Sequence, residues 1–224
     1  MFENNKEVVR PSRRDFLKYS GATMAVAGLI VAGCGDDDPE PMKARLGAGD
    51  TGVLNYAYAL EQLEAAFYTA VMATPYANMS SSEMVILEDL RKHEVAHREF
   101  LKAAIGNDAI PALEVDFSSI DFSDRASVLG AAKTFEDLGV SAYNGAGRLL
   151  MSADLLTIAG KIVSVEARHA AAIRSILDSN PRSFAGDDIV TTDNGLDVVR
   201  TPAEVLQAAA SFIVTEIDAS QLPS

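Results

Sequence analysis

The four-residue pattern Glu-x-x-His occurs twice in this chain, at Glu94–His97 and, 72 positions later, at Glu166–His169. The sequence has only three histidines, and the two patterns use two of them. On a helix, residues three apart lie on one face, so each pattern can direct a carboxylate and an imidazole to the same point. Two such helices facing each other would gather four metal-binding groups. We therefore expect helices that enclose a metal site.

An internal repeat supplies a further carboxylate upstream of each pattern. The segment 60–68 (LEQLEAAFY) aligns with 135–143 (FEDLGVSAY), so that Glu61 matches Glu136. These glutamates precede their Glu-x-x-His patterns by 33 and 30 residues, which fits two helices joined by a short loop. The chain is therefore expected to form two helical hairpins, the second a diverged copy of the first.

Four more polar residues are expected beside the site rather than in it: Glu64, Tyr68, Tyr143 and His93. Glu64 could replace Glu61 as a ligand, but its counterpart in the repeat is Gly139. We therefore prefer Glu61 as the ligand and treat Glu64 as the alternative. Each tyrosine follows its glutamate by two helical turns. The tyrosines either donate hydrogen bonds at the site, act as redox-active phenols or fill the core. His93 points about 100° away from Glu94 on a helix, so we expect it behind a ligand or at the surface.

Electrostatics favour metal ions at such a site. Four carboxylates inside one bundle would repel and desolvate one another, and some would take up protons. Two divalent cations would remove that penalty by balancing the four negative charges. A mixture of imidazole and carboxylate ligands suits iron, manganese or zinc better than calcium or magnesium.

The ligand pattern and the segment LNYAYALEQLEAAFY (54–68) resemble the ferritin-like di-iron carboxylate family, in particular its desiccation-related and twin-arginine-exported members. The resemblance covers roughly residues 50–215. It implies an all-α four-helix bundle with a long crossover between helices 2 and 3 and a short fifth helix at the C-terminus. It also implies two divalent metal ions, iron or alternatively manganese. By the same resemblance Glu94 and Glu166 bridge the metals, Glu61 and His97 complete one shell, and Glu136 and His169 complete the other.

Apolar periodicity and turn signals predict where these helices lie. Ser80 and Glu83 form a helix start, and so do Thr201 and Pro202. The segment 110–123 lacks a helical period and is expected to be the extended crossover. The helices are expected at 51–73, 81–105, 124–151, 152–179 and 202–213, with a long loop at 182–200.

The first predicted helix is apolar nearly all round. Opposite the face that carries Glu61 it presents Leu60, Leu63 and Phe67. A helix of this kind is buried on both sides. Either the crossover and the fifth helix cover the second face, which we prefer, or a second subunit of a homodimer does.

Residues 1–33 are expected to be an export signal. The segment SRRDFLK (12–18), with Arg13 and Arg14, fits a twin-arginine signal, and the apolar stretch that follows it is too short to span a bilayer. It leads into Cys34, the only cysteine, in a setting that resembles a lipoprotein processing site. Residues 34–50 then form a flexible acidic tether, and 51–215 the helical bundle.

These signals predict an exported protein that meets the twin-arginine translocation machinery. Cleavage before Cys34 would leave a lipid anchor as the only membrane attachment, at the outer face of the cytoplasmic membrane, in the periplasm or at the cell surface. An ordinary signal with an incidental cysteine is the alternative. The net charge of −13 argues against nucleic acid or an anionic membrane surface as a partner.

The resemblance implies a redox function, with Fe(II) oxidised or with O₂ or peroxide consumed at the metal pair. Two alternatives stay open: a non-catalytic metal-binding or desiccation-protective protein, and a scaffold bundle that no longer binds metal. The superfamily carries many chemistries on one fold, so the resemblance does not choose between them.

Overall fold

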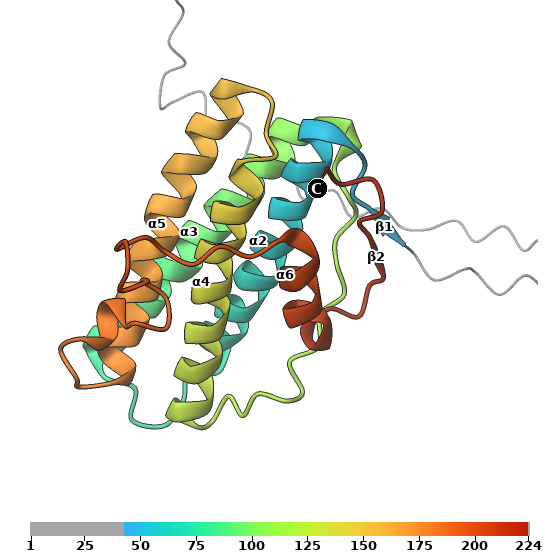
Figure 1. Ribbon diagram of the computed structural model, residues 1–224. Coiled ribbons are helices and arrows are strands. Elements are labelled where there is room, and N and C mark those ends of the chain that lie inside the picture. Colours follow the sequence, from blue (N-terminus) through green and yellow to red (C-terminus); the bar gives the residue numbers. More distant parts are fainter. Residues whose placement is uncertain (1–42, 224) are drawn as a thin grey trace, which may run out of the picture. The chain divides into compact units, whose positions relative to one another are not determined.

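Four long helices form the bundle in the structure, a computed structural model that describes residues 43–223 (Figure 1). Helix α2 packs chiefly against α3, and α4 chiefly against α5. The chain is therefore built from two hairpins, as the internal repeat predicts, and the all-α bundle is confirmed. The bounds of the four helices are Gly49–Ala73 (α2), Ser81–Ile105 (α3), Arg125–Gly147 (α4) and Ala153–Leu177 (α5).

Side-chain caps start most of these helices where the sequence places them. Ser80 and Glu83 form a capping box at α3, and Thr201 and Glu204 form another at α6 (Pro202–Ala209). The helices expected at 124–151 and 152–179 are shorter than predicted, because Ser152 caps α5 and Asp50 accepts hydrogen bonds from the preceding turn. The fifth helix is also shorter, and a 3₁₀ turn (η3, Ala210–Phe212) completes it.

The crossover runs along α2 and covers its second face. Gln62 donates to the Pro111 carbonyl at 3.3 Å and accepts from the Leu113 amide at 2.9 Å. Phe67 packs in an aromatic cluster with Phe117 and Phe122 from the crossover and Phe135 from α4. The chain itself therefore buries both faces of α2, and no second subunit is needed to cover it.

The two ends of the described chain meet in a short parallel strand pair, β1 (Ala44–Arg45) with β2 (Ile217–Asp218). We expected a flexible tether up to residue 50, but Ala44 and Leu46 are fully buried. The Leu46 carbonyl also accepts a hydrogen bond from the buried side chain of Asn55 at 3.0 Å. The ordered domain thus starts earlier than predicted and continues past residue 215.

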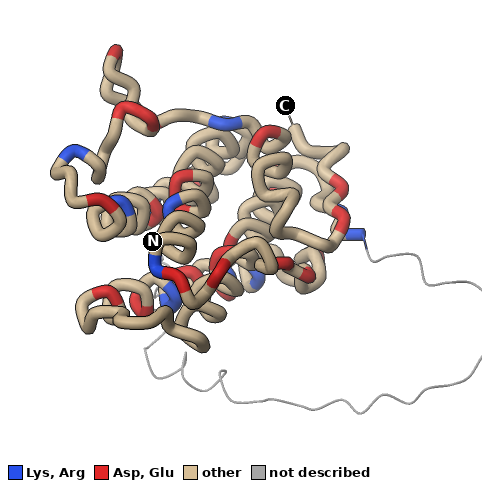
Figure 2. The backbone as a smooth tube through the Cα atoms, turned by 90° about the horizontal axis from the view of Figure 1, so that it is seen from below, with Lys and Arg blue, Asp and Glu red and all other residues tan. Residues whose placement is uncertain are grey.

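The export signal, Arg13, Arg14, Cys34 and the first part of the tether lie outside the described residues. Within residues 43–223, no helix is long and apolar enough to cross a membrane. Acidic residues occur in helices and loops alike (Figure 2). Most of them are exposed or half-buried, and the few that are buried lie where charge is costly unless it is paired or bound to a metal.

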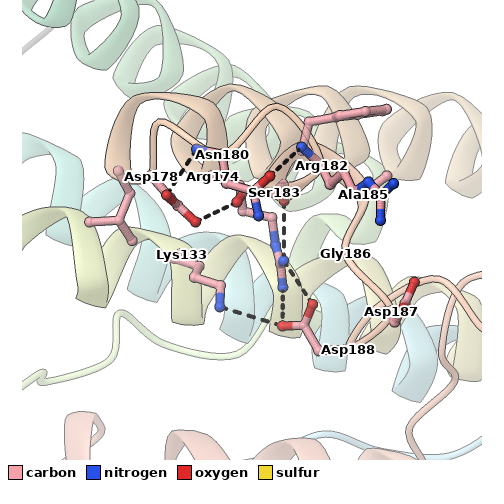
Figure 3. A pocket seen from close by; sticks show the side chains of 12 residues that line it. Lys133, Arg174, Asp178, Asn180, Arg182, Ser183, Ala185, Gly186, Asp187 and Asp188 are labelled. Carbon is pink, nitrogen blue, oxygen red and sulfur yellow. Dashed lines mark hydrogen bonds and ion pairs between the residues drawn. The ribbon is translucent and has the colours of Figure 1, made fainter.

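A buried arginine fixes the loop that follows α5 (Figure 3). Arg174 donates two hydrogen bonds to Asp137 of α4, at 2.8 and 2.6 Å, and two to Asp188 of the loop, at 3.0 and 2.8 Å. It lines a cleft of about 720 Å³ together with Lys133 and the 3₁₀ turn η2 (Ser183–Ala185). Since the guanidinium is fully paired, its role is to hold this loop against α4 and α5.

Candidate metal site

Five glutamates lie between the four long helices with at most 3% of their surface exposed. Helix α2 contributes two of them, and α3, α4 and α5 contribute one each. A carboxylate buried in this way is normally paired or bound to a metal. The five residues are Glu61, Glu64, Glu94, Glu136 and Glu166.

Four of the glutamates and two histidines form two adjoining groups. Around His97 Nδ1 lie Glu166 Oε1 at 3.0 Å, Glu61 Oε2 at 3.4 Å and Glu94 Oε2 at 3.5 Å. The donor atoms of this group all lie within 4.8 Å of one another. Their convergence on one point is the arrangement that a metal ion requires.

The second group is built in the same way around His169. Its Nδ1 lies 2.8 Å from Glu94 Oε1, 3.4 Å from Glu136 Oε2 and 3.9 Å from Glu166 Oε2. Glu94 and Glu166 therefore belong to both groups, and each directs one carboxylate oxygen into each. Both groups are buried in the described part of the chain and could hold a metal ion.

Hydrogen bonding tests whether the donor atoms fit a metal pair. Eight of the side-chain atoms that face these groups are buried and have no hydrogen-bond partner among residues 43–223. Such an atom typically costs about 1–3 kcal/mol, so eight would be a heavy burden on a bundle without metal. Four of these atoms belong to the His97 group and four to the His169 group, so each group offers four possible metal-binding atoms. They are Glu61 Oε2, both oxygens of Glu94 and Glu166, Glu136 Oε2, and Nδ1 of His97 and His169.

Two tyrosines donate hydrogen bonds to the carboxylate oxygens of Glu61 and Glu136 that do not face the two groups. Tyr68 of α2 donates to Glu136 Oε1 of α4 at 2.5 Å, and Tyr143 of α4 donates to Glu61 Oε1 of α2 at 2.5 Å. Burial, followed by the neighbouring glutamate, raises the pKa of each tyrosine well above its usual value. Both phenols are therefore protonated donors, and each orients one glutamate while leaving its second oxygen free.

Without metal, the cluster retains protons. Burial raises the pKa of Glu61 to about 8, and it also raises the pKa of Glu136 and Glu166. Burial alone would lower the pKa of the histidines, but the close carboxylates outweigh it and raise the pKa of His97 to about 12 and of His169 to about 10. Hence metal ions would have to displace protons, as is usual for ligands of this type.

The remaining candidates from the sequence lie around the two groups. Glu64 is buried but belongs to neither group. His93 is exposed, and its Nδ1 lies 2.9 Å from Nε2 of His169, so it lies at the surface and also behind a candidate ligand. Sequence reasoning missed this contact and the crosswise pairing of the tyrosines, because both depend on how the hairpins pack together.

Comparison with known families agrees with this geometry. A model of the ferritin-like domain matches residues 49–179, more than half of the chain. A model of the twin-arginine translocation signal matches residues 10–29, which include Arg13 and Arg14 and imply export across the cytoplasmic membrane by that machinery. No curated protein gave a significant match. By its fold and by the match over its helical bundle, the chain belongs to the ferritin-like domain family.

Proposed function

We propose that this protein binds two transition-metal ions between its four long helices. The observation that carries the proposal is the set of eight buried donor atoms without hydrogen-bond partners in the described chain, four at each position. In this proposal Glu94 and Glu166 would be shared by both ions, Glu61 and His97 would hold one ion, and Glu136 and His169 would hold the other. Iron fits the mixed imidazole and carboxylate donors, with manganese as the alternative.

We further propose a redox role for the loaded site. Two Fe(II) ions would supply one electron each, and with two protons they would reduce O₂ to hydrogen peroxide; peroxide is the alternative oxidant. The protein contributes donors held in place by Tyr68 and Tyr143, and a core that excludes bulk water. A site arranged in advance for two metals needs little reorganisation when their charge changes.

The proposed setting is the cell envelope. The twin-arginine signal supports export, and we propose that Cys34 becomes the lipidated N-terminus, so that the bundle works outside the cytoplasm. Globomycin-sensitive processing and incorporation of labelled palmitate would test the anchor. Loss of the label in Cys34→Ser is expected, and an unlabelled wild-type protein would rule the anchor out.

Elemental mass spectrometry of the purified full-length chain tests metal binding. The wild type should carry about two iron or manganese ions per chain, and His97→Ala should lose most of this content. Glu114→Gln is the matched control, because Glu114 is an exposed carboxylate outside both groups. A wild type that binds no metal after anaerobic reconstitution would identify a scaffold bundle instead.

Exposure to air then tests the redox role. Anaerobically loaded Fe(II) protein should develop near-ultraviolet absorbance and consume O₂ in proportion to its iron. A protein that holds two ions but shows neither change would be a metal binder without redox activity.

A further inference from the structure

The two halves of the site are related by the internal repeat, and they differ at two positions close to the cluster. Each half supplies one glutamate, one Glu-x-x-His pattern and one tyrosine. However, Glu64 aligns with Gly139, and His93 aligns with Val165. Both extra polar side chains come from the first hairpin, and both lie near members of the His169 group.

The carboxyl groups of Glu64 and Glu166 both approach Gly139. A Cβ atom added at Gly139 would lie 3.0 Å from Glu64 Oε1 and 3.6 Å from Glu166 Oε2, so the glycine leaves the room that the Glu64 carboxylate uses. Glu166 Oε2 is the oxygen that belongs to the His169 group. Glu64 is 3% exposed, so its carboxyl group is buried beside this oxygen. It is thus an additional buried carboxyl group near the oxygen that Glu166 directs toward the His169 group.

His93 supports the ligand histidine on the same side. Its ring lies within 4° of parallel to the ring of His169, and the two nitrogens are 2.9 Å apart. In the tautomer that leaves His169 Nδ1 free for a metal, Nε2 carries the proton and donates to His93. Such a bond fixes the ring of a ligand histidine and makes it a better donor.

His97 lacks both forms of support. No described residue donates to or accepts from its second ring nitrogen, and its side chain is 14% exposed against 4% for His169. The position that aligns with Glu64 is a glycine, so Glu61 and His97 have no extra carboxylate nearby. The tyrosine contacts are equal on the two sides, so they do not offset this difference.

We propose that the two metal positions are inequivalent, and that Glu64 and His93 make the Glu136–His169 position the tighter one. That position would fill first and keep its ion, because it has an additional carboxylate and an oriented histidine. The Glu61–His97 position would bind second and exchange more readily, which makes it the place where a small oxidant approaches. The inference rests on the proposed function, since it presupposes two bound metals.

Titration of the metal-free full-length chain with Co²⁺, followed by visible absorbance, tests the order of binding. The wild type should bind in two steps whose affinities differ about tenfold or more, the usual effect of such supporting residues. His169→Gln should remove the tight step, and His97→Gln should remove the weak one. Glu64→Gln and His93→Gln should each weaken the tight step about tenfold and change the weak step less than about threefold. Glu114→Gln serves as the charge-matched control and should change neither step.

Removing both supporting residues together provides the strongest check. In the double variant Glu64→Ala/His93→Gln the difference between the affinities of the two steps should shrink. Equal affinities in the wild type, or equal effects of Glu64→Gln on both steps, would overturn the inference while leaving the proposed function intact. A wild type that binds no Co²⁺ would instead refute the proposed function. If circular dichroism shows that the double variant is unfolded, the single variants decide.

Discussion

Glu61→Gln should stabilise the metal-free protein even though it removes a proposed metal ligand. Burial, opposed in part by His97, raises the pKa of Glu61 from 4.5 to about 8. The folded state therefore takes up a proton at neutral pH that the unfolded chain does not hold. Stability from this group is fully present below pH 4.5 and is lost as the pH rises through 8. Relative to its value at low pH, this contribution has fallen by about 1 kcal/mol at pH 5 and by about 3 kcal/mol at pH 7.

Glutamine avoids this cost because it is neutral, nearly isosteric with a protonated glutamate and still able to accept from Tyr143. Urea unfolding of chelator-treated protein should therefore show Glu61→Gln more stable than the wild type by up to about 3 kcal/mol at pH 7, with a smaller gain at pH 5. Saturating Mn²⁺ should reverse the order, since only the wild type gains from binding at both positions.

Two results would refute this reasoning. One is a Glu61→Gln protein that is less stable than the wild type without metal at pH 7. The other is a gain of equal size at pH 5 and pH 7, which would show that protonation of this carboxyl is not the cause. Glu114→Gln, at an exposed carboxylate, should change the unfolding free energy little at either pH.

Three further predictions concern pH and packing. Because metal ions must displace the protons held by His97 and His169, Co²⁺ affinity should rise about tenfold or more per pH unit between pH 6 and 8. Calorimetry in two buffers would count the released protons, and a pH-independent affinity would show that the histidines are not protonated. Arg174→Lys should lower the unfolding free energy by about 2 kcal/mol, because lysine cannot pair with both aspartates in the same geometry; an unchanged urea midpoint would show that the clamp is dispensable. Phe67→Ala should cost about 3–5 kcal/mol through the cavity left in the aromatic cluster, as measured by thermal unfolding, and a loss below about 1 kcal/mol would mean that the crossover collapses into the space.

The helices and the grouping of the candidate ligands could be predicted because their signals are local. Glu-x-x-His fixes two side chains on one helical face, and the repeat supplies the upstream glutamates in the same register. The capping boxes that begin at Ser80 and Thr201 each span four residues, so they predict a helix start from local sequence alone. The repeat also made Glu61 preferable to Glu64, and in the structure Glu61 belongs to a group that could hold a metal ion while Glu64 does not.

Contacts between distant segments could not be predicted in this way. The Asn55 side chain donates hydrogen bonds to the Leu46 and Asp108 carbonyls and accepts one from the Ile110 amide. Nothing in the local sequence indicates that this residue connects these segments. The paired strands are two residues long, too short for an alternating pattern, and so the segment before α2 resembled a linker. The crosswise tyrosine bonds depend on the packing of one hairpin against the other, which the repeat does not specify.

The strand pair between Ala44 and Ile217 has a mechanical consequence. Tension applied to residue 43 would be resisted by β1–β2 hydrogen bonds and by the buried Leu46 before it reached α2. Helix α2, which carries Glu61, is thereby shielded from strain transmitted along the preceding chain. A pull on the chain at residue 43 would then load the β1–β2 pair at the edge of the domain, and the distances between the donor atoms would be preserved.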